Sequence, residues 1–275
     1  MRAHVMLLSC LLLTGCFGFS FWFERLDTLT LWRLDDMFDL TREQEAVLEP
    51  ALAELKEQVR TEHVPAIIRR LERVEQLWQS GARQAAVDAL DKAILDTFEA
   101  FLEGSWPMVA SVAPHLTDAN ARHYLAYGER KAEEWFSEYE SEEAKQEEWV
   151  DRFEDWFGDL DDAQVAQVRA AVVWSPDEQA MLMDNSRQRR ERFMALALSG
   201  DWQALEQAWK QPWSLNAPAY SLWWDAERVR VRQLLAGLLP TLTEGQARHA
   251  RDRVEQWRLK LASVRPGDRP GPEGE

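Results

Sequence analysis

A ten-residue motif occurs twice in the chain and constrains its fold more than any other feature. The first copy is PHLTDANARH at 114–123 and the second is PTLTEGQARH at 240–249. Six of the ten positions are identical, and two of the differences replace an acid or an amide by its longer or shorter homologue. The chain is therefore predicted to be internally duplicated.

Both copies of the motif also mark the start of a helix. A threonine followed three residues later by an amide can form a capping box, in which each side chain bonds the other residue's backbone N–H. The same pattern recurs elsewhere, and apolar residues between these starts recur at three- and four-residue spacing rather than alternating. The fold class predicted is all-α, an internally duplicated multi-helix bundle or short helical superhelix. The predicted boxes are Thr41/Gln44, Thr117/Asn120, Asp161/Gln164, Ser175/Glu178 and Thr243/Gln246.

Further matches extend the predicted duplication. Leu40-Thr41 corresponds to Leu160-Asp161 at an offset of 120 residues, and the Ser-Gly pair at 80–81 corresponds to that at 199–200 at an offset of 119. These Ser-Gly pairs suit helix ends that need a left-handed residue. We predict a first helical repeat over 40–158, closed by one long helix over 117–157, and a second repeat over 159–263. The alternative is that helix caps resemble one another because the same physics selects them.

The N-terminus has the layout of a lipoprotein precursor. One basic residue precedes an apolar run that is too short to span a bilayer, and Leu13-Thr14-Gly15-Cys16 matches a lipobox. Residues 1–15 are predicted to be a signal peptide, with Cys16 diacylated on sulfur and acylated again at its amino group. Because Cys10 would be removed with the signal, the mature chain would hold no free thiol.

The residues after the lipobox carry a resemblance. Arg25-Leu26-Asp27, Leu34-Asp35-Asp36 and Asp39-Leu40-Thr41-Arg42-Glu43-Gln44 follow one another, and the match covers residues 13–44. This arrangement resembles the signature of an uncharacterised family of Gram-negative bacterial lipoproteins, a domain of unknown function. The resemblance implies an envelope lipoprotein and brings no activity with it. Met37 and Phe38 stand where a tyrosine is expected in such proteins.

Localisation is predicted from the residue after the acylated cysteine. Aspartate at that position is the usual inner-membrane retention signal in enteric lipoproteins, whereas this chain has Phe17. We therefore expect an outer-membrane lipoprotein facing the periplasm, held in the membrane by palmitate-like chains on Cys16. The aromatic stretch at 17–23 would lie against lipid headgroups or pack into the fold.

Candidate interaction residues lie in two places. The lipidated segment 16–39 offers Arg25, Trp32, Asp35, Asp36 and Asp39, whose carboxylates could bind a cation or serve a glycosidase but are also typical helix-start partners. The second place is Trp213, Trp223 and Trp224, which could line a groove for glycan or peptide or could pack between helices. No metal, cofactor or catalytic residue is predicted, because neither a zinc nor a serine-hydrolase motif occurs.

Charge excludes one class of partner. The net charge of -16 disfavours nucleic-acid binding, which requires cationic groups to replace counterions. Residues 129–162 hold 15 acidic and 4 basic residues, a net of -11, and either form a solvated face or receive Arg187, Arg189, Arg190 and Arg192. Residues 264–275 are predicted to be a disordered tail.

Taken as a whole, the sequence favours a non-catalytic envelope lipoprotein that acts as a periplasm-facing interaction scaffold for an envelope protein or the cell wall. The alternative is an envelope enzyme or a carrier of glycan or peptide, using the three aspartates or the tryptophan cluster.

Overall fold

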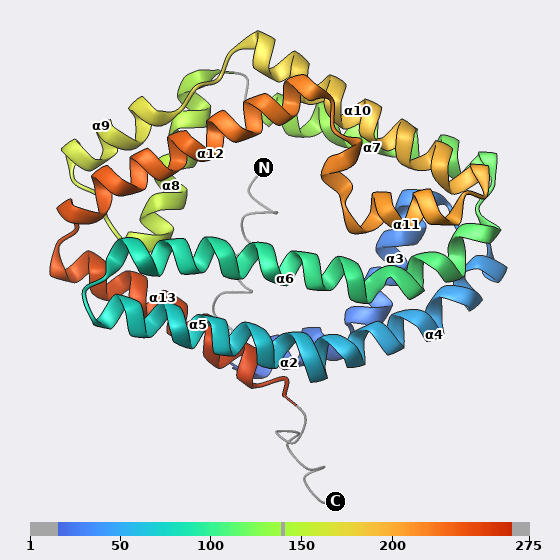
Figure 1. The fold of residues 1–275 in the computed structure, drawn as a ribbon, viewed down its shortest axis with the longest axis horizontal. Coiled ribbons are helices and arrows are strands. Elements are labelled where there is room, and N and C mark those ends of the chain that lie inside the picture. The colour runs from blue at the N-terminus through green and yellow to red at the C-terminus, as the bar shows by residue number, and fades with distance from the viewer. Residues whose placement is uncertain (1–15, 139–140, 266–275) are drawn as a thin grey trace, which may run out of the picture. The chain divides into compact units, whose positions relative to one another are not determined.

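The computed structural model describes residues 16–138 and 141–265, and within these residues the chain is all-α, as predicted (Figure 1). The elements in order are α2 (Cys16–Glu24), α3 (Leu26–Phe38), α4 (Arg42–Gln58), the π-helical turn η1 (Val59–His63), α5 (Val64–Gln79), α6 (Arg83–Val112), the 3-10 turn η2 (Ala113–His115), α7 (Asp118–Glu138), α8 (Glu142–Phe157), α9 (Asp162–Ala171), α10 (Pro176–Ser199), α11 (Trp202–Lys210), η3 (Pro212–Leu215), α12 (Pro218–Leu238), η4 (Leu239–Thr241) and α13 (Glu244–Ala262). The predicted signal peptide, 1–15, lies outside the described residues.

The described residues form two compact units, each assembled from segments that are distant in sequence. Unit 1 comprises 16–33, 45–108 and 254–265, and unit 2 comprises 34–44, 109–138 and 141–253.

All five predicted capping boxes are present. In the first, Gln44 N–H donates to Thr41 Oγ1 at 3.3 Å, and Thr41 N–H donates to Gln44 Oε1 at 2.8 Å. The boxes at Thr117, Asp161, Ser175 and Thr243 have the same reciprocal bonds. Each satisfies two backbone groups that would otherwise lack partners at the start of a helix.

The predicted Ser-Gly helix ends are also confirmed. Gly81 has φ of 82° and Gly200 has φ of 75°, so both occupy the left-handed region where a side chain is strained. α5 ends before the first pair and α10 ends at the second.

The single long helix predicted over 117–157 is wrong. α7 ends at Glu138, and α8 begins at Glu142 after Ser141, whose hydroxyl accepts a hydrogen bond from Ala144 N–H at 3.1 Å. Serine in an extended conformation is a favoured N-cap, so the local sequence contained the signal for a second helix start.

The caps of unit 2 join in pairs through their amide side chains. We call the pair of Gln44 and Asn120 the first amide clasp. Gln44 Nε2 donates to Asn120 Oδ1 at 2.9 Å and to His115 O at 2.6 Å. Asn120 Nδ2 donates to Phe38 O at 2.9 Å and to Asp39 O at 3.1 Å. Both amides are buried, and each ties its own helix start to the chain that precedes the other helix.

The second amide clasp, Gln164 with Gln246, has the same plan. Gln246 Nε2 donates to Gln164 Oε1 at 2.7 Å and to Asp159 O at 2.8 Å. Gln164 Nε2 donates to Thr241 O at 3.3 Å and to Gln246 Oε1 at 3.1 Å. Asp159 and Thr241 follow Asp39 and His115 at the offsets of 120 and 126 residues found in the sequence. The match is what an internal duplication requires, although the duplication itself stays a prediction.

The repeated histidines of the motif have matching structural contacts. His123 Nε2 lies 3.1 Å from Asp36 O in the last turns of α3, and His249 Nε2 lies 3.3 Å from Asp155 O in the last turn of α8. A carbonyl can only accept, so each Nε2 carries the proton. Each ring therefore donates a hydrogen bond to a carbonyl in the last turn of a helix, where carbonyl groups have no partner within the helix.

The core of unit 1 lies around one face of α5. Phe23, Val64, Ile68 and Val264 are buried together, with Phe19 and other apolar side chains packed against them. Val264 was predicted to open the disordered tail, and this is wrong for that residue because its side chain is 4% exposed. The rest of the predicted tail, 266–275, lies outside the described residues.

Candidate functional site

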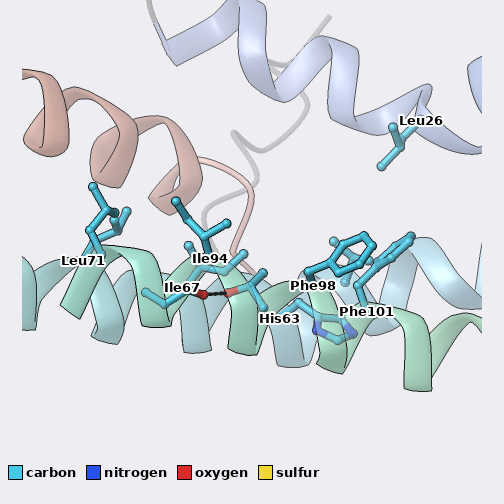
Figure 2. A pocket seen from close by; sticks show the side chains of 11 residues that line it. Leu26, His63, Ile67, Leu71, Ile94, Phe98 and Phe101 are labelled. Atoms are coloured by element: carbon cyan, nitrogen blue, oxygen red, sulfur yellow. Dashed lines mark hydrogen bonds between the residues drawn. The ribbon is translucent and has the colours of Figure 1, made fainter. Parts of the chain in front are cut away.

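An apolar groove runs between α5 and α6 in unit 1 (Figure 2). We call it the α5–α6 groove. Its volume is about 430 Å³, and apolar side chains make up nearly all of its wall. The lining residues are Leu26, Val59, His63, Ile67, Leu71, Leu90, Ala93, Ile94, Thr97, Phe98 and Phe101.

Helix periodicity explains the two long walls. On one wall, Val59, His63, Ile67 and Leu71 follow at intervals of four residues. On the other wall, the lining residues 90, 93, 94, 97, 98 and 101 each lie three or four residues from another member of the set. Side chains at these spacings share one face of a helix. The turn at 80–82 brings Leu71 to one end of the groove, and Figure 2 shows His63 with the two phenylalanines toward the other.

The π-helical turn η1 places His63 in the wall. Its backbone bond runs from Val64 N–H to Val59 O, one residue longer than an α-helical bond. Pro65 follows directly, and proline has no N–H to donate and crowds the carbonyl four residues earlier. Both properties of Pro65 weaken the α-helical pattern at this turn. Such turns are rare inside helices and are frequent at functional sites.

His63 is the buried polar group of the groove that has no partner. Its side chain is only 9% exposed, and its Nε2 atom is buried without a hydrogen bond. Burial lowers the pKa of His63 below the usual 6.5, and the charge of Arg70 lowers it further, while Glu62 opposes both. The imidazole is therefore neutral at pH 7, where it has one donor and one acceptor nitrogen. Phe101 packs against the ring at an angle of 60°, with centroids 6.4 Å apart.

Thr97, the other polar residue of the wall, differs from His63. Its hydroxyl donates to Ala93 O at 2.6 Å and accepts from Arg70 Nη1 at 3.0 Å. Buried polar groups in folded proteins are almost always satisfied in this way, and an exception needs an explanation. His63 Nε2 is the exception in this groove.

The groove also leaves apolar surface open to solvent. Ile94 is 60% exposed, and Phe98 and Phe101 are partly exposed beside it. Apolar side chains exposed singly are normal, whereas a contiguous set that lines a groove is typical of a binding surface. The opposite face of α5 is buried in the core of unit 1, so one face of this helix packs in the core and the other lines the groove.

The candidate residues of segment 16–39 do not form one site. The Arg25 guanidinium lies over the Phe21 ring at 3.8 Å, and Trp32 is 66% exposed. Helix α2 is two-sided. Phe19 and Phe23 pack into unit 1, which confirms the packed alternative for one face, while Phe21 and neighbouring Trp22 are exposed on the other. Contact of the exposed face with lipid headgroups stays a prediction.

The three aspartates support the local chain. Asp35 Oδ1 accepts from Leu40 N–H at 3.0 Å, Asp36 O faces His123, and Asp39 O accepts from Asn120. Asp39 also has φ of 51°, a left-handed conformation that aspartate tolerates better than most residues. Among the described residues no group of three or more potential metal ligands is found. The geometry is that of a helix end rather than of converging carboxylates.

The three candidate tryptophans differ in their surroundings. Trp223 Nε1 donates to Glu178 Oε1 at 3.1 Å, which ties α12 to the start of α10. Trp224 is partly exposed and stacks on Tyr220 at 6.5 Å, with an angle of 7° between the rings. Trp213 lies in η3 and is also partly exposed.

The arginines of α10 make mostly local contacts. Arg187 pairs with Asp184 at 2.5 Å, and Arg192 donates to Leu215 O at 2.8 Å. Arg190 lies against α7, where a Cβ on Gly128 would collide with its side chain. The glycine at 128 therefore makes room for a partly buried cation near the acidic segment.

Comparisons with family models, curated proteins and solved structures give no match for this chain. A search of the described helices also finds none that combines the length and apolarity needed to cross a bilayer. The groove is therefore a candidate site on the strength of its geometry alone.

Proposed function

We propose that the protein is a non-catalytic lipoprotein of the outer membrane that acts as a periplasm-facing interaction scaffold, with the α5–α6 groove as its binding surface. The observation that supports this most strongly is the groove itself, whose open wall is almost wholly apolar. Such a site favours binding over chemistry, because acid–base or nucleophilic catalysis needs several polar groups aimed at one point.

Anchoring through Cys16 is part of the proposal. α2 begins at Cys16 and exposes Phe21 and Trp22, which are side chains that favour the interface of a membrane. We expect Cys16→Ser to remain unlabelled by a palmitate analogue in cells and to leave the membrane fraction. Labelling of the variant at the wild-type level would contradict this part of the proposal.

A cross-linking experiment tests the groove as the binding surface. A photoactivatable phenylalanine analogue is placed at Ile94 in the groove or, as a matched control, at Leu222, which is 73% exposed on α12. In irradiated cells we expect a discrete adduct, whether protein or lipid, from position 94 and not from position 222. The same adduct pattern at both positions, or none at 94, would contradict the proposal.

A further inference from the structure

Helices α2 and α3 present exposed aromatic side chains close to Cys16. Phe21, Trp22 and Trp32 are 52%, 42% and 66% exposed. Tryptophan is on average a strongly buried residue, so an exposed set of this kind within 21–32 needs an explanation. We call the outward side chains of this stretch the α2–α3 strip. Its members are Phe21, Trp22, Arg25, Leu29, Trp32 and Arg33.

Helical spacing places the strip on one face. Each member lies three or four residues from another, and side chains at these spacings share a face of a helix. The Arg25 guanidinium lies over the Phe21 ring at 3.8 Å, so the face continues from α2 across the junction with α3. Phe19 and Phe23 point the other way and pack in the core of unit 1. The strip is therefore the outward face of a segment whose inward face is already packed.

The charges of the segment are also sorted. Glu24 Oε1 accepts from Arg60 Nη2 at 2.9 Å, and Asp27 Oδ2 pairs with Lys56 Nζ at 2.7 Å. Both carboxylates are thus paired with cations of unit 1, whereas the two arginines of the strip are exposed. A chain with a net charge of -16 therefore presents arginine and aromatic side chains together on this face.

This composition favours one class of partner. Aromatic and leucine side chains are favoured at the interface of a bilayer, and arginine is attracted to anionic headgroups. Residues 21–33 extend about 18 Å at about 1.5 Å per residue, so the whole strip can reach the headgroups only where α2 and α3 lie along the bilayer surface. The strip also begins less than two helical turns beyond Cys16, where the proposed acyl chains would enter the lipid.

From these observations we infer that the α2–α3 strip lies in the headgroup region of a bilayer that contains anionic phospholipid, with α2 and α3 along the membrane surface. The inference rests on the proposed anchoring through Cys16 and goes beyond it. Acyl chains on one residue tether a protein and leave its orientation free, whereas a strip about 18 Å long fixes which face of unit 1 meets the lipid.

Quenching by lipid tests the inference in the full acylated chain. A fluorescent aromatic amino acid replaces Trp32 or, as a matched control in the same unit, Gln84, which is exposed on α6. The protein is placed in phosphatidylethanolamine–phosphatidylglycerol vesicles that carry a nitroxide on the lipid headgroup. We expect position 32 to lose most of its fluorescence and position 84 to lose little. Equal quenching at both positions, or none at position 32, would overturn the inference.

Arg25 gives the second arm. Arg25→Glu places a carboxylate against anionic headgroups, and we expect it to lower the ratio of membrane-docked to undocked strip about fivefold or more, as weaker quenching at position 32. Arg73→Glu, the same charge change on exposed α5 surface, should leave the quenching unchanged. In phosphatidylcholine vesicles the two variants should agree. Wild-type quenching of Arg25→Glu in the anionic vesicles would overturn the contact of Arg25 with the headgroups.

These outcomes differ from failure of the proposed anchoring. If a palmitate analogue labels Cys16 and position 32 is not quenched, the anchoring stands and the inference fails. If Cys16 stays unlabelled and position 32 is quenched, the strip binds lipid by itself and the anchoring fails. A discrete protein adduct from a photo-cross-linker at position 32 in cells, without quenching in vesicles, would assign the strip to a protein partner and overturn the inference.

Discussion

The amide clasps of unit 2 and the α5–α6 groove of unit 1 treat buried polar groups in opposite ways. In each clasp, both side-chain amides form hydrogen bonds to the backbone of a helix cap, to carbonyl groups of the chain before a helix, and to each other. In the groove, one buried imidazole nitrogen has no partner and stands among exposed apolar side chains. A fully satisfied polar network stabilises a fold, whereas a buried polar atom without a partner lowers its stability.

The largest effect on stability is expected in a clasp. Gln164 is 2% exposed, and Gln164→Leu would leave the N–H of Asp161 and the carbonyl of Thr241 without these partners. It would also remove one of the hydrogen bonds on each side of the Gln246 amide. We expect the free energy of unfolding to fall by about 3 kcal/mol, measured by urea denaturation. Gln84→Leu on the exposed face of α6 is the control, with a change within about 0.5 kcal/mol. Equal free energies of unfolding for the two variants would show that a clasp amide contributes no more to stability than an exposed glutamine.

Removal of the His63 imidazole should not lower the free energy of unfolding, in contrast to removal of a clasp amide. Because His63 Nε2 is buried without a partner, His63→Leu is expected to leave the free energy of unfolding unchanged or to raise it by up to about 1 kcal/mol. The same urea titration measures it. A loss comparable to that of Gln164→Leu would mean that His63 holds the fold together as the clasps do.

Substitution of the exposed wall should affect stability least. Ile94→Asp replaces a largely exposed side chain, so its free energy of unfolding is expected to stay within about 0.5 kcal/mol of the wild type. A large loss of stability in this variant would show that the open wall belongs to the core.

The pH dependence follows from the lowered pKa of His63. The unfolded chain takes up a proton near pH 6.5, while the folded imidazole resists it, so the unfolded state binds more protons below that pH. Stability contributed at pH 7 is therefore lost as the pH falls from about 6.5 through the folded pKa. We expect His63→Leu to show a smaller fall in unfolding free energy between pH 7 and pH 5. An identical fall in both proteins would contradict a desolvated His63.

Local signals made much of the fold predictable. Capping boxes and Ser-Gly helix ends depend on residues within a few positions, so all five boxes and both left-handed glycines could be read from the chain. The pairing of capping boxes into clasps could not be predicted in this way. Gln44 and Asn120 are 76 residues apart, and no local pattern indicates which helix starts come together.

The candidate site was missed for a related reason. Apolar residues at helical spacing on α5 predict a packed helix, and periodicity does not tell a covered face from an open one. Ile67 and Leu71 belong to that pattern, yet they line the groove. The one available signal was Pro65, which follows the wider turn that presents His63.

The most direct measurement of the central claim is photo-cross-linking in cells from position 94 in the α5–α6 groove, with position 222 on α12 as the matched control. The account predicts a discrete adduct from position 94 that position 222 does not give. The same adduct pattern at both positions, or no adduct from position 94, would contradict it.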